Sequence, residues 1–141
     1  MQNGDLAPSD RPRYVLVLEG VLCEVVPVMA TKGVLRQKER VIGYHFNWHE
    51  IPLKRTVYLR DQFPEVGLDI VTFVDQSVAD QAATFLETLR VPYDSVVFKP
   101  FEDFCWQVSF QPDLKAVYDS DSTRLDQYGQ LGRGVIRGHD F

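Results

Sequence analysis

Glu19 is the first residue of this chain whose type and position could do chemistry. It follows an apolar run, Val15 to Leu18, and Gly20 comes directly after it. The run predicts a fully buried strand from Tyr14 to Leu18 that ends at an acidic, glycine-containing turn. Functional groups of open α/β sheets lie just beyond the carboxyl ends of the strands. A carboxylate at that position is poorly placed unless something uses it, so Glu19 is a candidate site residue.

Other polar residues lie at the ends of later apolar runs. Asp75 and Ser77 follow the run 68–74, and Ser77 is suited to cap the helix that comes next. Lys99 follows the run 96–98, and Asp119 and Asp121 follow the run 114–118. If these runs are neighbouring parallel strands, their polar ends lie along one edge of a sheet.

The apolar patterns predict the elements that would position these side chains. They indicate strands at 68–74, 96–98, 114–118 and 135–136, and helices at about 51–62 and 78–90, over one or two turns within 101–110, and around Leu125 and Tyr128. Alternating strands and helices with short loops form right-handed crossovers in a largely parallel sheet covered on both faces. We therefore expect a three-layer α/β/α sandwich of Rossmann-like type. The sequence predicts an irregular leader over residues 1–13 and a single domain over residues 14–141.

The segment between the first strand and the first helix has a different pattern. Two strand-like runs lie on either side of a polar, glycine-containing middle within residues 23–47, and this arrangement is typical of a β-hairpin. Its tip is basic over residues 32–40, which suits either a solvated turn or the steering of an anion.

The composition excludes several classes of function. The net charge of −5 argues against general nucleic-acid binding, which needs a basic surface. No apolar run approaches the ~20 residues that span a bilayer, and the polar N-terminus does not resemble a signal peptide. The two cysteines, Cys23 and Cys105, form no disulfide framework, so a reduced cytoplasm is the expected location.

The first strand and its turn resemble motif I of the haloacid dehalogenase-like (HAD) phosphotransferases. That motif is an apolar strand followed by Asp-x-Asp-Gly-Thr/Val-Leu, and residues 20–22, Gly-Val-Leu, match its second half. Glu19 stands at the second, acid/base Asp, and Val17 stands at the nucleophilic Asp. The family also places a β-hairpin flap directly after this motif, which matches the hairpin at 23–47.

Traces of the other HAD motifs follow in order. Thr72, or less well Ser77, corresponds to motif II, Lys99 with Pro100 to motif III, and Asp119 with Asp121 to motif IV. The resemblance is nearest to the small capless members found in bacteria and phages. It implies that Thr72 and Lys99 bind phosphoryl oxygens. It implies that Asp119 and Asp121 hold Mg²⁺. It further implies that Lys99 and Asp119 come within salt-bridge range or share one water, and that the strands at 68 and 114 flank the Tyr14 strand.

Val17 is the departure from the family pattern with the largest consequence, because valine can neither attack phosphorus nor bind a metal. The resemblance therefore implies a catalytically degenerate protein that binds a protein partner or a small anionic ligand, with Mg²⁺ at most weakly held. The alternative is a Mg²⁺-dependent HAD-like phosphohydrolase whose atypical site uses Glu19, Lys99 and the Asp119–Asp121 pair. A plain doubly wound domain is a third reading, although it lacks a glycine-rich phosphate loop.

Two weaker candidates lie outside the motifs. His45 and His49 have the spacing of metal ligands on one helix face, but neighbouring glycine and proline argue against a helix there. Cys23 could replace the missing nucleophile, but the sequence places no base beside it.

Overall fold

The computed structural model describes residues 12–32, 38–111, 113–131 and 136–138 of the chain. A turn, η2, spans Leu18–Leu22 and joins the first two strands, with non-helical backbone angles at Glu19 and Gly20. The strands are β1 (Arg13–Val17), β2 (Cys23–Lys32), β3 (Lys38–Trp48), β4 (Gly67–Thr72), β5 (Ser95–Phe98), β6 (Leu114–Tyr118) and β7 (Ile136–Gly138). The helices are α1 (Glu50–Gln62), α2 (Gln76–Thr88), α3 (Phe101–Phe110) and α4 (Ser122–Gln130).

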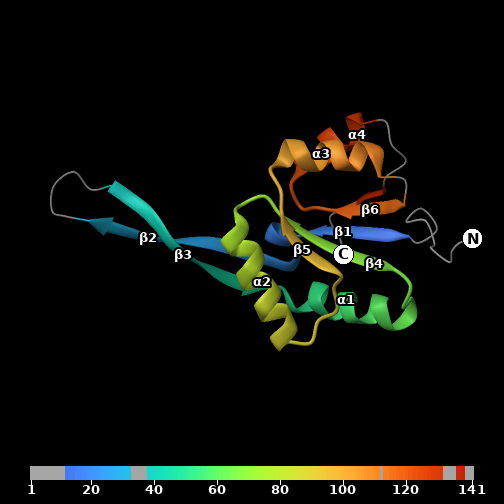
Figure 1. The fold of residues 1–141 in the computed structure, drawn as a ribbon, viewed down its shortest axis with the longest axis horizontal. Helices are drawn as coiled ribbons and strands as arrows, with labels where there is room; N and C mark the ends of the chain where they lie inside the picture. The colour runs from blue at the N-terminus through green and yellow to red at the C-terminus, as the bar shows by residue number, and fades with distance from the viewer. Residues whose placement is uncertain (1–11, 33–37, 112, 132–135, 139–141) are drawn as a thin grey trace, which may run out of the picture.

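The central sheet has five strands in the order β5-β4-β1-β6-β7, and each neighbouring pair is parallel (Figure 1). β1 lies at its centre, with β4 and β6 as its neighbours. The prediction that the strands at 68 and 114 flank the Tyr14 strand is therefore confirmed. Because all five strands point the same way, their carboxyl ends share one edge of the sheet.

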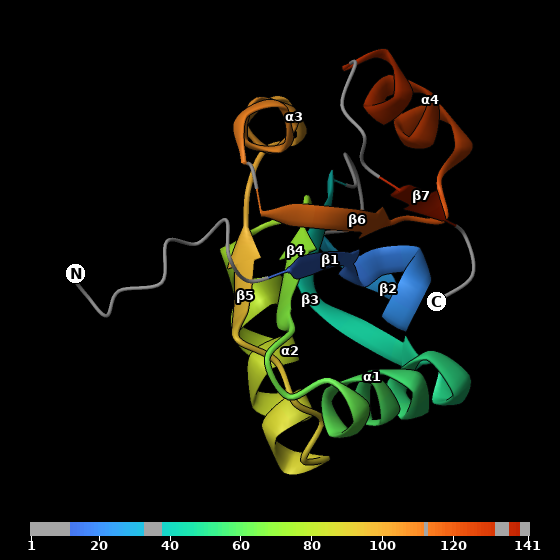
Figure 2. The same cartoon turned by 90° about the vertical axis from the view of Figure 1, so that its right-hand side faces the viewer.

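Helices cover both faces of this sheet, with α1 and α2 on one side and α3 and α4 on the other (Figure 2). Alternation along β1 sends Leu16 toward the α1–α2 side, and Val15 and Val17 toward the α3–α4 side. Both faces of β1 are covered, since Leu16 and Val17 are each 0% exposed. The predicted α/β fold with a largely parallel sheet is confirmed.

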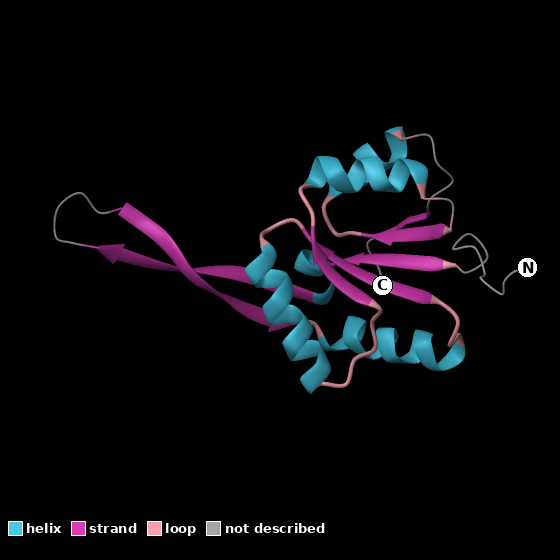
Figure 3. Cartoon of the chain, viewed as in Figure 1, coloured by secondary structure: helices cyan, strands magenta, loops and turns pink. Residues whose placement is uncertain are grey.

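Strands β2 and β3 form an antiparallel ribbon that projects from the domain (Figures 1 and 3). The hairpin predicted over 23–47 is thus present. Its base is fixed to α2, because the Trp48 and Phe85 rings stack 4.9 Å apart and the Tyr44 hydroxyl donates a 2.8 Å hydrogen bond to Asp75. The rest of the ribbon leaves apolar side chains exposed, namely Val26, Val28, Met29, Val41 and Ile42.

Some expectations about individual elements were wrong. The cap of α2 is Asp75, whose carboxylate accepts from the Val78 amide, whereas Ser77 lies inside the helix and donates to Asp75. Asp75 takes this role because α2 begins at Gln76, so the Asp75 carboxylate lies next to the amide of Val78, three residues on. Helix α3 spans ten residues rather than one or two turns, because Phe104 and Val108 pack against the sheet. Most of the expected leader and Val135 lie outside the described residues, while Arg13 belongs to β1.

A search of the described helices finds none with the length and apolar character needed to cross a membrane.

Candidate functional site

Glu19 lies at the carboxyl end of β1, within the turn η2, and reaches the end of the neighbouring strand. Its Oε2 accepts a 2.9 Å hydrogen bond from the backbone amide of Phe73, which directly follows β4. Its Oε1 is buried and has no hydrogen-bond partner. The carboxylate therefore joins two strand ends and keeps one oxygen free of hydrogen bonds.

Asp119 directly follows β6 and is fully buried, at 0% exposure. Arg124 of α4 binds it with two hydrogen bonds, 2.7 Å from Nε to Oδ2 and 2.9 Å from Nη2 to Oδ1. The hydroxyl of Tyr128, one turn further along α4, donates a third at 2.7 Å. Both carboxylate oxygens are therefore bonded to donors, and the buried negative charge is balanced by a guanidinium.

Arg124 and Tyr128 both stay protonated beside Asp119, as their hydrogen bonds to it require. Burial alone would lower the pKa of Arg124, but its hydrogen bonds and attraction to Asp119 outweigh that effect and raise the pKa above its ordinary value. Burial, followed by the negative charge of Asp119, raises the pKa of Tyr128 far above its ordinary value. Tyr128 is therefore a hydrogen-bond donor at any physiological pH.

Arg124 also connects the β6 end to the β4 end. Its guanidinium carbon lies 5.1 Å from the centroid of the Phe73 ring, within the range of a cation–π contact. Glu19, Phe73, Arg124 and Asp119 thus form a continuous chain of contacts across the ends of β1, β4 and β6. We call these residues, together with Tyr128, the strand-end cluster.

The turn after β1 fits closely against the loop after β6. Gly20 has φ +99°, a conformation that side chains rarely adopt, and a Cβ on it would collide with the Ser120 hydroxyl. A glycine is therefore required where the two loops meet.

Val17, at the position where the HAD nucleophile was expected, is an ordinary core residue. It is 0% exposed and belongs to the apolar cluster that β1 shares with α3 and α4. Its surroundings include Phe104, Leu125 and Tyr128.

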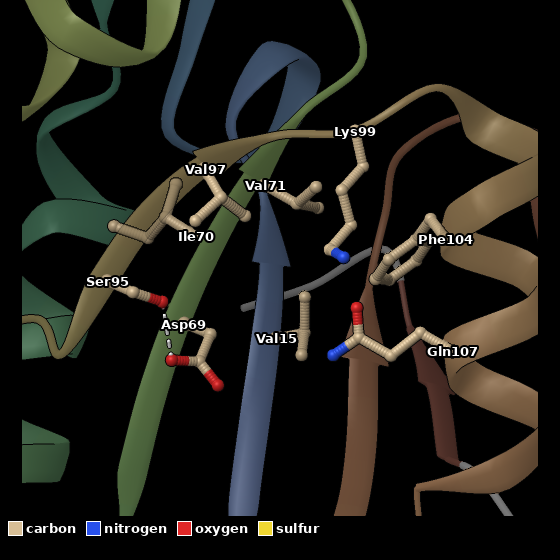
Figure 4. A pocket seen from close by; sticks show the side chains of 9 residues that line it. All are labelled: Val15, Asp69, Ile70, Val71, Ser95, Val97, Lys99, Phe104 and Gln107. Carbon is tan, nitrogen blue, oxygen red and sulfur yellow. Dashed lines mark hydrogen bonds between the residues drawn. The ribbon is translucent and has the colours of Figure 1, made fainter.

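The structure does not bring Thr72 and Lys99 into the strand-end cluster. Thr72 is buried, and its hydroxyl oxygen accepts a 3.2 Å hydrogen bond from the Val74 amide within its own turn. Lys99 donates its backbone amide to the Thr72 carbonyl at 3.1 Å. Its side chain, however, points into a cavity between the sheet and α3, toward Phe104 and Gln107 (Figure 4).

The direct ion pair expected between Lys99 and Asp119 does not form among the described residues, while one water shared between the two stays a prediction. In the described part of the chain, the ion pair of Asp119 is with Arg124, and Lys99 forms none. The physical reason is distance along the chain: Arg124 lies in the first turn of α4, directly after the loop that carries Asp119, and its side chain reaches that carboxylate.

Asp121 has a local role. It is the N-cap of α4, and its carboxylate accepts a 2.9 Å hydrogen bond from the Arg124 amide. Its own amide donates to Asp119 at 3.0 Å. The pair Asp119–Asp121 therefore builds a loop and a helix start, which is how such acidic turns are most commonly used.

The histidine and cysteine candidates lie apart from this cluster. His45 is exposed on β3 and bonds Asn47, while His49 precedes α1 and bonds the Val21 carbonyl. Among the described residues, no three His, Cys, Asp or Glu side chains are grouped as metal ligands. Burial, and to a smaller extent the charge of Glu19, raises the pKa of Cys23 to about 12, so its reactive thiolate is scarcely populated at neutral pH.

Sequence reasoning missed Arg124, Tyr128 and Phe73. Arg124 and Tyr128 are four residues apart on one helix, so they share a face, and this face begins just after the acidic loop. That spacing was a usable signal. The contact of Phe73 with Arg124 had no counterpart in the sequence.

Neither the scan against protein-family models nor the search of curated proteins found a match to this chain.

Proposed function

We propose that this chain is a catalytically degenerate HAD-like protein that acts by binding a partner or a ligand rather than by transferring phosphoryl groups. The observation that carries the proposal is the occupation of Asp119 by Arg124 and Tyr128. Asp119 is the residue that would correspond to the metal-binding acid of the family. A guanidinium with two hydrogen bonds to it leaves neither oxygen open to a cation.

The arrangement of the strands supports the HAD-like part of the proposal. β1 is central, β4 and β6 flank it, and a β-hairpin follows β1 after a short turn. The family resemblance implied each of these features. Under the proposal, the ribbon β2–β3 corresponds to the flap of the family.

The residues at the strand ends do not fit Mg²⁺ as they are arranged. Mg²⁺ prefers six oxygen ligands in octahedral geometry, usually with one or two carboxylates among them. Asp119 is paired with Arg124, Asp121 caps α4, and one oxygen of Glu19 accepts from Phe73. We therefore propose no step through a metal, and Val17 supplies no nucleophile.

The exposed ribbon supports the binding part of the proposal. Val26, Val28, Met29 and Val41 are 42–44% exposed, and Ile42 is 58% exposed. Met29 and Val41 are paired across the ribbon, and contiguous exposed apolar surface of this kind marks interaction sites.

A substitution series with and without Mg²⁺ tests the proposal. The unmodified chain should not hydrolyse para-nitrophenyl phosphate above background, and its thermal midpoint should not respond to Mg²⁺. Val17→Asp should lower stability, because it buries a carboxylate in an apolar cluster. The double variant Val17→Asp with Arg124→Met places one carboxylate on β1 and frees another on Asp119, so Mg²⁺ should raise its midpoint.

Val15→Asp with Arg124→Met is the matched control for this series. Val15 is also a buried residue of β1 on the α3–α4 side, at 3% exposure, but it lies two residues away from the strand end. It should gain no response to Mg²⁺. Mg²⁺-dependent turnover by the unmodified chain would overturn the proposal in favour of an atypical phosphohydrolase. Equal responses of the two double variants would contradict the assignment of Val17 and Asp119.

A further inference from the structure

A cavity of about 140 Å³ lies between the sheet and α3 (Figure 4), and its lining residue Phe104 also packs against Phe73 and Tyr128 of the strand-end cluster. A cavity of about this size holds a benzene-sized molecule, which has about six non-hydrogen atoms. Its walls are polar and apolar in similar measure: Val15, Val71, Val97 and Phe104 suit an alkyl group, and Asp69, Ser95, Lys99 and Gln107 suit a polar one.

Two polar side chains in this cavity have unused hydrogen-bonding capacity. No carboxylate of the described residues lies within ion-pair distance of Lys99. Gln107 donates its amide nitrogen to Gln111 at 2.7 Å, while its Oε1 is buried and has no hydrogen-bond partner. Figure 4 shows both side chains directed into the cavity. An unpaired buried acceptor is costly, so a ligand that supplies a donor to Gln107 would bind favourably.

The other charged residue of the cavity is already neutralised. Asp69 accepts two 2.8 Å hydrogen bonds from Arg13 and one of 2.7 Å from Ser95. Its negative charge therefore does not offset that of Lys99, and the cavity favours an anion over a cation or a neutral molecule.

We propose that this cavity binds a small hydroxy-carboxylic acid. The carboxylate pairs with the Lys99 ammonium, the hydroxyl donates to Gln107 Oε1, and the short alkyl part lies against Val15, Val71 and Phe104. An inorganic phosphate carries more charge than the single lysine balances and has no apolar part for these walls. The inference rests on the ligand-binding part of the proposed function and names its ligand class.

Titration of the full chain with lactate, followed through the methyl NMR signals of Val15, Val71 and Val97, tests this inference. Lactate should bind saturably, with a Kd below about 10 mM, which is a reasonable affinity for so small a ligand. Propionate, which lacks only the hydroxyl, should bind about three- to tenfold more weakly, because it leaves Gln107 Oε1 unpaired. Inorganic phosphate should bind more weakly than either.

Variants assign the contacts. Lys99→Met keeps most of the length of the side chain but removes its charge, and should weaken lactate binding at least about tenfold. Gln107→Leu should lower the affinity for lactate to that of the unmodified chain for propionate. Lys115→Met, which removes an exposed lysine of β6, is the control and should change neither the affinity for lactate nor that for propionate.

Absence of saturable lactate binding, tighter binding of phosphate than of lactate, or unchanged binding by Lys99→Met would each overturn the inference. The comparison of lactate, propionate and phosphate uses the unmodified chain, so it does not depend on the folding of any variant. The cavity shares no side chain with the strand-end cluster. A failed titration would therefore leave the Mg²⁺ test of the proposed function unaffected.

Discussion

At the scale of single residues, the buried Asp119 carboxylate depends on its two side-chain partners. Arg124 balances its charge and Tyr128 completes its hydrogen bonding, while Asp119 itself is fully buried. A buried ion pair adds little compared with apolar residues, but removing one member leaves an uncompensated charge. The two partners should therefore differ in how much their loss costs.

Arg124→Met should lower the free energy of unfolding by roughly 3 kcal/mol, because Asp119 then keeps its charge without a cation. Tyr128→Phe removes one hydrogen bond to the same charged group and should cost about half as much. Urea denaturation at pH 7 measures both. Arg40→Met, at an exposed arginine of β3, is the control and should stay within about 0.5 kcal/mol of the unmodified chain. An Arg124→Met protein as stable as that control would show that the pair is not needed.

At the scale of elements, the positions of the strands could be predicted because buried parallel strands are continuous apolar runs. Leu114–Tyr118 was predicted with the bounds that the structure shows, and the hairpin followed from the strand-like runs on either side of a polar turn. The length of α3 could not be predicted, because its aromatic residues suit strand and helix equally.

The candidate site was harder to predict than the fold. Glu19 and Asp119 were correctly expected at strand ends, because that follows from strand polarity alone. Their partners depend on side-chain direction: Lys99 turns back along the sheet while Arg124 reaches Asp119 from a helix. Sequence order gives no information on such a choice between two cations.

The turn between β1 and the ribbon should depend strictly on its glycine. Gly20→Ala forces a side chain into positive φ and against Ser120, so it should cost about 2 kcal/mol. Gly43→Ala on β3 is the matched control, since a Cβ there meets no atom within 4 Å, and it should be nearly neutral. Urea denaturation of Gly20→Ala with and without Ser120→Ala separates the two causes. Full rescue by Ser120→Ala would show that the collision, rather than the backbone, sets the cost.

At the scale of the whole molecule, the ribbon and the domain should be separable. The outer ribbon exposes its apolar side chains, whereas its base is held by the Trp48–Phe85 stack. A two-stranded ribbon contributes little stability by itself.

Replacing residues 28–43 with Asn-Gly would join the paired positions Pro27 and Tyr44 through a two-residue turn. The thermal midpoint should then change by less than about 4 °C, because none of the removed side chains that the structure describes belongs to the core. Trp48→Ala should lower the midpoint further than this deletion does, because it removes a large aromatic side chain that packs against the core. A deletion variant that unfolds at a much lower temperature would show that the outer ribbon stabilises the domain.

The order of the strands also determines when the domain can form during synthesis. β1 is made first, but its partners β4 and β6 follow about 54 and 101 residues later, as the pairings of Arg13 with Gly67 and Leu114 show. One edge of this apolar strand therefore stays unpaired until β6 has left the ribosome. Such non-local pairing slows folding and exposes a strand edge to other chains. Nascent chains that stop before residue 114 should consequently be the ones that aggregate or recruit chaperones.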